Sequence, residues 1–162
     1  MAKIARNFVG KSLYEKAIAD FINAATNQDD PYKICAVMAW PIRAMLCAND
    51  NRGAKHWYEF AKIKSLEISY PGSKAEALIS IFQAIFPMSD EFTLTEADQL
   101  IALLSPPIHW RQKRAVKNIV RFLNFKFPEK TKIFADTITD GTVQKLAVRV
   151  LELGEKYPVR DF

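Results

Sequence analysis

The 162-residue sequence has few of the residues that carry catalysis or cross-links: two cysteines, two histidines and five glycines. Cys35 and Cys47 fall within one predicted helix, about 18 Å apart at ~1.5 Å per residue. A disulfide needs less than ~7 Å between Cα atoms, so we expect both thiols to be reduced. Reduced thiols are typical of the cytoplasm, which is the location we predict.

Long hydrophobic runs are also missing. The longest apolar stretches, residues 34–42 and 77–81, fall short of the ~18 residues that a transmembrane helix needs. The first ten residues carry Lys3 and Arg6 but lack the apolar core of a signal peptide. We therefore expect no membrane association, with residues 1–11 as a candidate mobile basic arm.

No motif for catalysis or for a cofactor is present. His109 has no Cys or carboxylate at the i±3 or i±4 spacing of a helical metal site, and His56 has only Glu59 at i+3, which does not complete a metal site. Asp136 and Asp140 lie four residues apart, but Asp140 precedes Gly141 at a helix end, where capping accounts for it. Without a glycine-rich phosphate loop or a nucleophile elbow, the sequence predicts a non-enzymatic protein that uses no metal or cofactor.

What is abundant is apolar sequence with a helical period. Hydrophobic residues make up 49% of the chain, which is long enough for one self-sufficient core. Three segments match the capping box S/T-x-x-E: Ser12–Glu15, Ser73–Glu76 and Thr93–Glu96. We predict a single all-α domain over residues 1–162, a helical bundle or compact array of about seven to eight helices.

The predicted helices follow from caps, prolines and apolar residues at three- and four-residue steps. Pro41 is expected to bend or break the second helix. Residues 66–70 alternate in polarity and predict an extended exit into a Pro71-Gly72 turn. The expected helical ranges are 12–27, 30–48, from after Gly53 to about 66, 73–86, 93–105, 107–126, 128–137 and 142–154.

One of these helices, residues 107–126, is strongly basic. Residues 99–128 contain six Lys or Arg and no acidic residue, whereas ordinary surface helices mix the two signs. Residues 99–162 hold twelve basic and six acidic residues, against eleven and twelve in residues 1–98. On a helical wheel, one side is apolar and the opposite side is cationic. The apolar side comprises Ala115, Val116, Ile119, Val120, Phe122 and Leu123.

A cationic stripe with an aromatic residue at its head suits a nucleic-acid backbone and a stacked base. We therefore hypothesise a non-enzymatic, nucleic-acid-associated protein, a small helical subunit that binds RNA or DNA backbone within a larger nucleoprotein assembly. Lys130 and Lys132, or Lys3, Arg6 and Lys11, are candidates to extend the surface. The predicted binding residues are Trp110, Arg111, Lys113, Arg114, Lys117 and Arg121.

Three alternatives stay open. The stripe is also what the solvated face of an ordinary helix would show. A protein-binding adaptor or inhibitor could dock an acidic partner on the same face, with Trp40, Tyr58 or Phe127 as an aromatic anchor. Residues 100–104, the Pro106-Pro107 corner and the basic helix could also form a helix-turn-helix that reads DNA, although only Arg111 and Gln112 suit base contacts.

Overall fold

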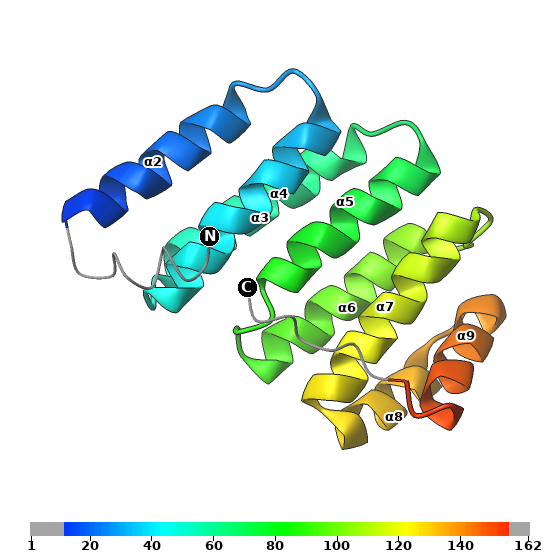
Figure 1. The fold of residues 1–162 in the computed structure, drawn as a ribbon. Helices are drawn as coiled ribbons and strands as arrows, with labels where there is room; N and C mark the ends of the chain where they lie inside the picture. Colours follow the sequence, from blue (N-terminus) through cyan, green and yellow to red (C-terminus); the bar gives the residue numbers. More distant parts are fainter. Residues whose placement is uncertain (1–11, 156–162) are drawn as a thin grey trace. The chain divides into compact units, whose positions relative to one another are not determined.

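The computed structural model describes residues 12–155, apart from the side chains of residues 12 and 13. Within this range the chain forms eight α-helices and no strand (Figure 1), which confirms the all-α prediction. The chain divides into two compact units between Met88 and Ser89, and each is described by itself. The single domain over residues 1–162 stays a prediction, and the proposed arm at residues 1–11 lies outside the described residues.

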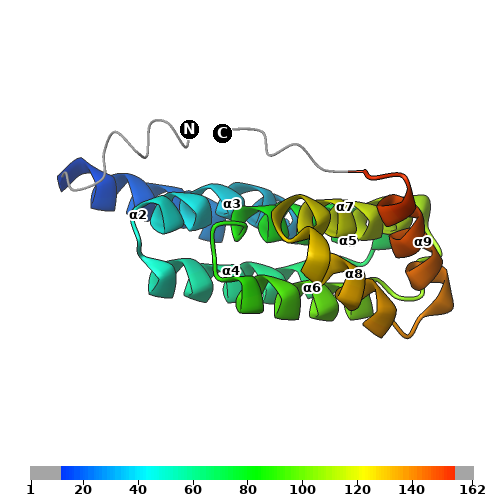
Figure 2. The same cartoon turned by 90° about the horizontal axis from the view of Figure 1, so that it is seen from below.

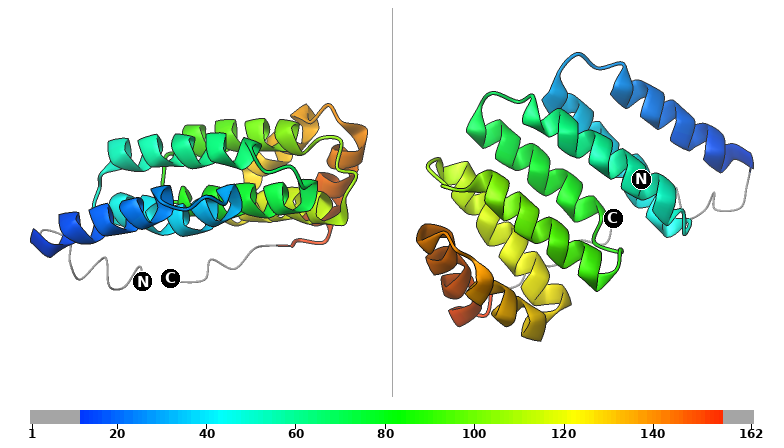
Figure 3. Two further views of the ribbon diagram at one scale, coloured as in Figure 1. Left: turned by 90° about the horizontal axis from the view of Figure 1, so that it is seen from above. Right: turned by 180° about the vertical axis from the view of Figure 1, so that it is seen from behind.

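The N-terminal unit is organised around one central helix. It contains α2 (Ser12–Thr26), α3 (Pro31–Cys47), α4 (Asn51–Leu66) and α5 (Pro71–Ala84). Helix α3 contacts each of the other three. Figure 2 shows α2, α3 and α5 in one layer and α4 in a second, and the views in Figure 3 agree. The core of this unit includes the fully buried side chains Met38, Ile42, Tyr58, Leu78 and Phe82.

The C-terminal unit has a corresponding centre. It contains α6 (Asp90–Leu104), α7 (Trp110–Lys126), α8 (Pro128–Thr137) and α9 (Gly141–Glu152). Here α7, the predicted basic helix, contacts α6, α8 and α9. The core includes Leu100, Leu104, Val116, Ile119 and Leu123, all buried. Burying one aliphatic side chain of this size contributes about 1.5–3 kcal/mol to stability.

Two predicted capping boxes are wrong. Helix α6 begins at Asp90, because the Ser89 hydroxyl accepts a hydrogen bond from the Phe92 N–H (3.4 Å). Thr93 is buried within the first turn, and its hydroxyl donates to the Ser89 carbonyl (2.9 Å). Ser89 followed by two acidic residues is itself a helix-start pattern, since carboxylates favour the positive end of the helix dipole.

Helix α5 likewise begins earlier than Ser73. Pro71 is its first residue, where a missing N–H costs no intrahelical hydrogen bond, and Tyr70 is the N-cap residue without a side-chain cap. Residues 67–70 connect α4 to α5 without a strand, but the predicted extended exit over residues 66–70 is wrong at its start, because Leu66 is the last residue of α4 and Glu67 keeps helical backbone angles. Pro71 and Gly72 belong to the helix rather than to a turn. The Ser12–Glu15 box depends on the Ser12 side chain, which lies outside the described residues.

The second and third helices also differ from the prediction at single positions. Pro41 was expected to bend or break the second helix, and the break does not occur, since α3 stays continuous through Pro41. Helix α4 begins at Asn51, because the Asp50 carboxylate accepts from the Gly53 N–H (2.8 Å). A Cβ atom at Gly53 would collide with that carboxylate, which explains a glycine in the first helical turn.

Both cysteines are free, as predicted. Cys35 is fully buried, and its thiol donates to the Ala61 carbonyl oxygen (3.2 Å). Burial raises the pKa of the Cys35 thiol to about 12. None of the helices described is long and apolar enough to cross a bilayer.

Candidate functional site

The start of α7 is fixed by a reciprocal capping box. His109 is the N-cap residue, and its Nδ1 accepts from the Arg111 N–H (3.1 Å). The Gln112 side-chain oxygen accepts from the His109 N–H (2.8 Å), and its amide nitrogen donates to the Leu104 carbonyl at the end of α6 (3.3 Å). The basic helix therefore begins at Trp110, three residues later than the predicted start, and Trp110 is its first residue.

One face of α7 is core. The six residues of the predicted apolar side are all buried, together with Asn124. The Asn124 side-chain amide donates to the Glu155 carbonyl just beyond α9 (3.0 Å). This face is the one that packs within the C-terminal unit, so the cationic residues of α7 lie on the remaining surface.

Trp110 is exposed at the head of the helix. Its side chain keeps 57% of its accessible surface. The guanidinium carbon of Arg114 lies 4.9 Å from the ring centroid and that of Arg111 lies 5.3 Å away. Both distances are within the ~6 Å range of cation–π attraction. Trp110 thus has two arginines beside it while much of its ring surface is open to solvent.

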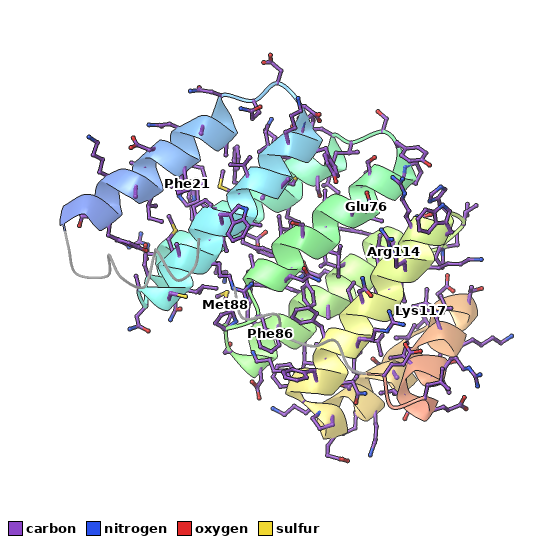
Figure 4. The ribbon with its side chains drawn as sticks, in the orientation of Figure 1. Phe21, Glu76, Phe86, Met88, Arg114 and Lys117 are labelled. Atoms are coloured by element: carbon purple, nitrogen blue, oxygen red, sulfur yellow. The ribbon has the colours of Figure 1, made fainter. Side chains whose placement is uncertain are left out.

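Two lysines continue from this aromatic head along the helix. Lys113 and Arg114 are exposed and Lys117 is half-buried, and Figure 4 shows Arg114 and Lys117 following one another along α7. Among the described residues, neither Lys113 nor Lys117 forms an ion pair. We call Trp110, Lys113, Arg114 and Lys117 the cationic stripe. It extends about 10 Å along the helix axis.

Arg121 lies further along α7 but is engaged within the unit. Its Nε donates to the Glu155 carboxylate (2.6 Å), Nη2 contacts the same carboxylate oxygen, and Nη1 donates to the Asn118 side chain (3.1 Å). Arg111 is half-buried. The structure therefore brings four of the six predicted residues together on one exposed face, while Arg111 adjoins Trp110 and Arg121 is ion-paired with Glu155.

The predicted extensions of the surface are also ion-paired or outside the described part. Lys130 pairs with Asp90 (3.0 Å) and Lys132 with Glu129 (3.2 Å). Burial lowers the pKa of Lys126, whose amine lies 4.6 Å from the centroid of the Phe127 ring. The extension through Lys3, Arg6 and Lys11 falls outside the described residues.

A groove of about 570 Å³ lies elsewhere in the C-terminal unit, between the end of α6 and the α8–α9 connection. Asp98 and Asp140 line it, and Asp140 also caps α9 by accepting from the Thr142 and Val143 N–H groups (2.9 and 3.0 Å). The described residues contain no cluster of three metal-ligating side chains. Because its carboxylates would repel phosphate, the groove cannot continue a phosphate-binding surface.

Sequence reasoning missed an exposed apolar corner between α6 and α7. Leu103, Ile108 and Trp110 are 43%, 83% and 57% exposed, and we call these three residues the apolar corner. The predicted helix began at residue 107, but residues 105–109 lie between α6 and α7, so a helical wheel could not assign the exposure of Ile108. Of the aromatic anchors considered for a protein partner, Tyr58 and Phe127 are buried and Trp40 is partly exposed.

Comparison of the chain with protein-family models, with curated proteins and with solved structures found no match. The candidate function therefore depends on the geometry and charge of α7 itself.

Proposed function

We propose that this protein binds nucleic acid without catalysing a reaction, with the sugar-phosphate backbone held against the cationic stripe of α7. The observation that carries the proposal is an exposed tryptophan and exposed cations on one acid-free face of a helix whose other face is core. Ammonium and guanidinium groups neutralise phosphates and release condensed counterions, which drives binding.

The small number of cations limits the affinity. Lys113 and Lys117, which form no ion pair among the described residues, offer about two phosphate contacts, for which log K should fall with log[salt] at a slope of roughly −1.4 on a single strand. That slope corresponds to a loss of roughly 7-fold between 50 and 200 mM salt. Such weak binding supports a role as one subunit of a larger nucleoprotein assembly, in which other components add contacts.

The test is a titration of labelled single-stranded and duplex oligonucleotides at several salt concentrations. The variant K113E/K117E reverses two exposed or half-buried lysines and should weaken binding at least 10-fold, with a slope shallower by roughly 1.4. The matched control K16E/K33E makes the same change in net charge at two exposed lysines of the N-terminal unit. Equal losses in both variants, or no binding at 50 mM salt, would contradict the proposal.

A second candidate is favoured by Ile108, the most exposed large apolar residue in the described part of the chain. Exposed apolar side chains beside tryptophan and arginine are typical of protein-binding hot spots, so an acidic protein could dock here instead. Affinity purification of the tagged chain before and after nuclease treatment separates the two. An acidic protein retained after nuclease by the wild type, and lost from K113E/K117E, would favour this second candidate.

A further inference from the structure

The apolar corner adjoins the cationic stripe at the one residue that the two share, Trp110. Ile108 precedes it by two residues in the loop, and Leu103 lies near the end of α6. All three are exposed by more than 40% of their surface. A ligand that covered the head of α7 would therefore meet the exposed apolar surface of Ile108 and Trp110 together with the cations of the stripe.

We propose that the nucleic acid bound here is single-stranded, with an unpaired base stacked on Trp110 and its flanking phosphates on the cations of the stripe. This inference rests on the proposed function and names the form of its ligand. In a duplex the base faces are stacked inside, and the outer surface that meets a protein is largely phosphate and sugar. Unpaired bases instead offer flat apolar faces that stack on aromatic side chains.

The energetics of the corner favour the unpaired strand. Pressing Ile108 and Trp110 against a phosphate backbone would desolvate charged oxygens without hydrogen bonds in return, which is unfavourable. Covering the same side chains with a base removes apolar surface from water on both partners. An unpaired strand therefore uses both the apolar corner and the cations of the stripe, whereas a duplex uses only those cations.

Arg111 and Arg114 lie where base stacking on Trp110 and phosphate binding can occur together. The guanidinium groups of Arg111 and Arg114 lie 5.3 and 4.9 Å from the centroid of the Trp110 ring. Phosphates on either side of a base stacked at that ring would come within reach of these groups, and Lys113 lies on the same exposed face. One bound nucleotide would thus engage an aromatic surface and at least one cation.

Tryptophan fluorescence gives a direct measurement. The chain has three tryptophans, so W40F/W57F leaves Trp110 as the sole reporter in the full-length protein. We expect its emission to be quenched by an unlabelled single-stranded oligonucleotide of DNA or RNA and to be unchanged by a duplex of the same sequence. Quenching by the single-stranded DNA or by the single-stranded RNA supports the inference, and equal quenching by the duplex overturns it.

Affinity measurements on W110L provide the second test. Loss of one stacked base should weaken single-strand binding roughly 5- to 150-fold without changing the salt slope, and duplex binding should change less than about 2-fold. W110F should retain most of the affinity, and W40L, at a 38% exposed tryptophan of the N-terminal unit, should retain all of it.

The outcomes separate this inference from the proposed function. If K113E/K117E weakens binding but W110L leaves the single-strand affinity intact, backbone binding stands and the stacked base is wrong. If neither strand form binds the wild type at low salt, both fail. If an acidic protein binds through Trp110 and no oligonucleotide does, the site belongs to a protein partner and the inference is overturned.

Discussion

Helices α3 and α7 have the same structural role but carry different outer faces. Each has 17 residues and contacts the three other helices of its unit. Eight residues of α3 and seven of α7 are buried. Neither contains an acidic residue, yet α3 has only Lys33 and Arg43 where α7 has six basic residues.

This difference bears on why the cations of α7 are present. The exposed positions Ala36 and Trp40 of α3 are small or apolar, and α3 still serves as the centre of its unit. A central helix therefore does not need a cationic outer face in order to pack. The stripe on α7 is an addition to the packing requirement, which favours a binding role over an ordinary solvated surface.

The units themselves do not differ much in charge. The sequence up to Met88 has eleven basic and eight acidic residues, and the sequence from Ser89 to Asp161 has twelve and ten. The strong asymmetry at residues 99–162 arises because that range leaves out four acidic residues of α6, namely Asp90, Glu91, Glu96 and Asp98. The contrast is thus between two adjacent helices of one unit.

Core truncation should affect both central helices alike and gives the largest expected effect. Ile42 in α3 and Ile119 in α7 are fully buried. I42A and I119A should each lower the free energy of unfolding of their unit by about 2–5 kcal/mol, since each leaves a cavity. Urea denaturation followed by circular dichroism measures this, with K113A as an exposed control that should change it by less than ~0.5 kcal/mol. A cost below 1 kcal/mol at Ile119 alone would show that α7 is not the centre of its unit.

Removing the N-cap of α3 or of α7 should lower the free energy of unfolding by less than core truncation does. Asp30 caps α3 by accepting from the Tyr32 N–H (2.9 Å), and His109 caps α7. D30A and H109A should each lower the free energy of unfolding by about 0.5–2 kcal/mol, because one backbone N–H loses its partner. H109D restores an acceptor and should recover most of the loss in the same denaturation experiment. If H109D is as unstable as H109A, the histidine has a role other than capping.

Releasing Arg121 from its ion pair with Glu155 should strengthen the binding of nucleic acid to α7. E155Q removes the carboxylate charge that holds this arginine and keeps the backbone carbonyl that Asn124 contacts. We expect the single-strand salt slope to become steeper by roughly 0.7 and the affinity at 50 mM salt to rise by a factor of about 2–5. The control E152Q makes the same charge change at the Arg149 pair. Equal gains in both variants would mean that net charge, not Arg121, is responsible.

The mildest test compares two positions within α3. Cys35 is fully buried with a pKa raised to about 12, and Cys47 is partly exposed. A thiol reagent at pH 8 should therefore label one cysteine per folded chain, detected by mass spectrometry, and both after unfolding. Because a raised thiol pKa favours the folded state only while the thiol is protonated, stability should fall as the pH rises above about 9. Rapid labelling of Cys35 at pH 8 would contradict its burial in α3.

Much of this fold could be predicted because helix formation depends on residues close together in the chain. The apolar side of α7 followed from its period, and every residue assigned to it is buried. Helix starts were less predictable where two caps compete. Ser89 prevails over Thr93 because Thr93 is itself buried in the unit, which no local pattern shows.

The sequence by itself determined the helices and the two-faced character of α7, since a 3.6-residue period needs only the neighbouring residues. Only the tertiary structure decided which cations remain available. Arg121 meets Glu155 across 34 residues of chain and Lys130 meets Asp90 across 40, whereas Lys113 and Lys117 meet no acidic partner among the described residues. The exposure of Trp110 was decided in the same way, because burial and ion pairing depend on residues that only packing brings together.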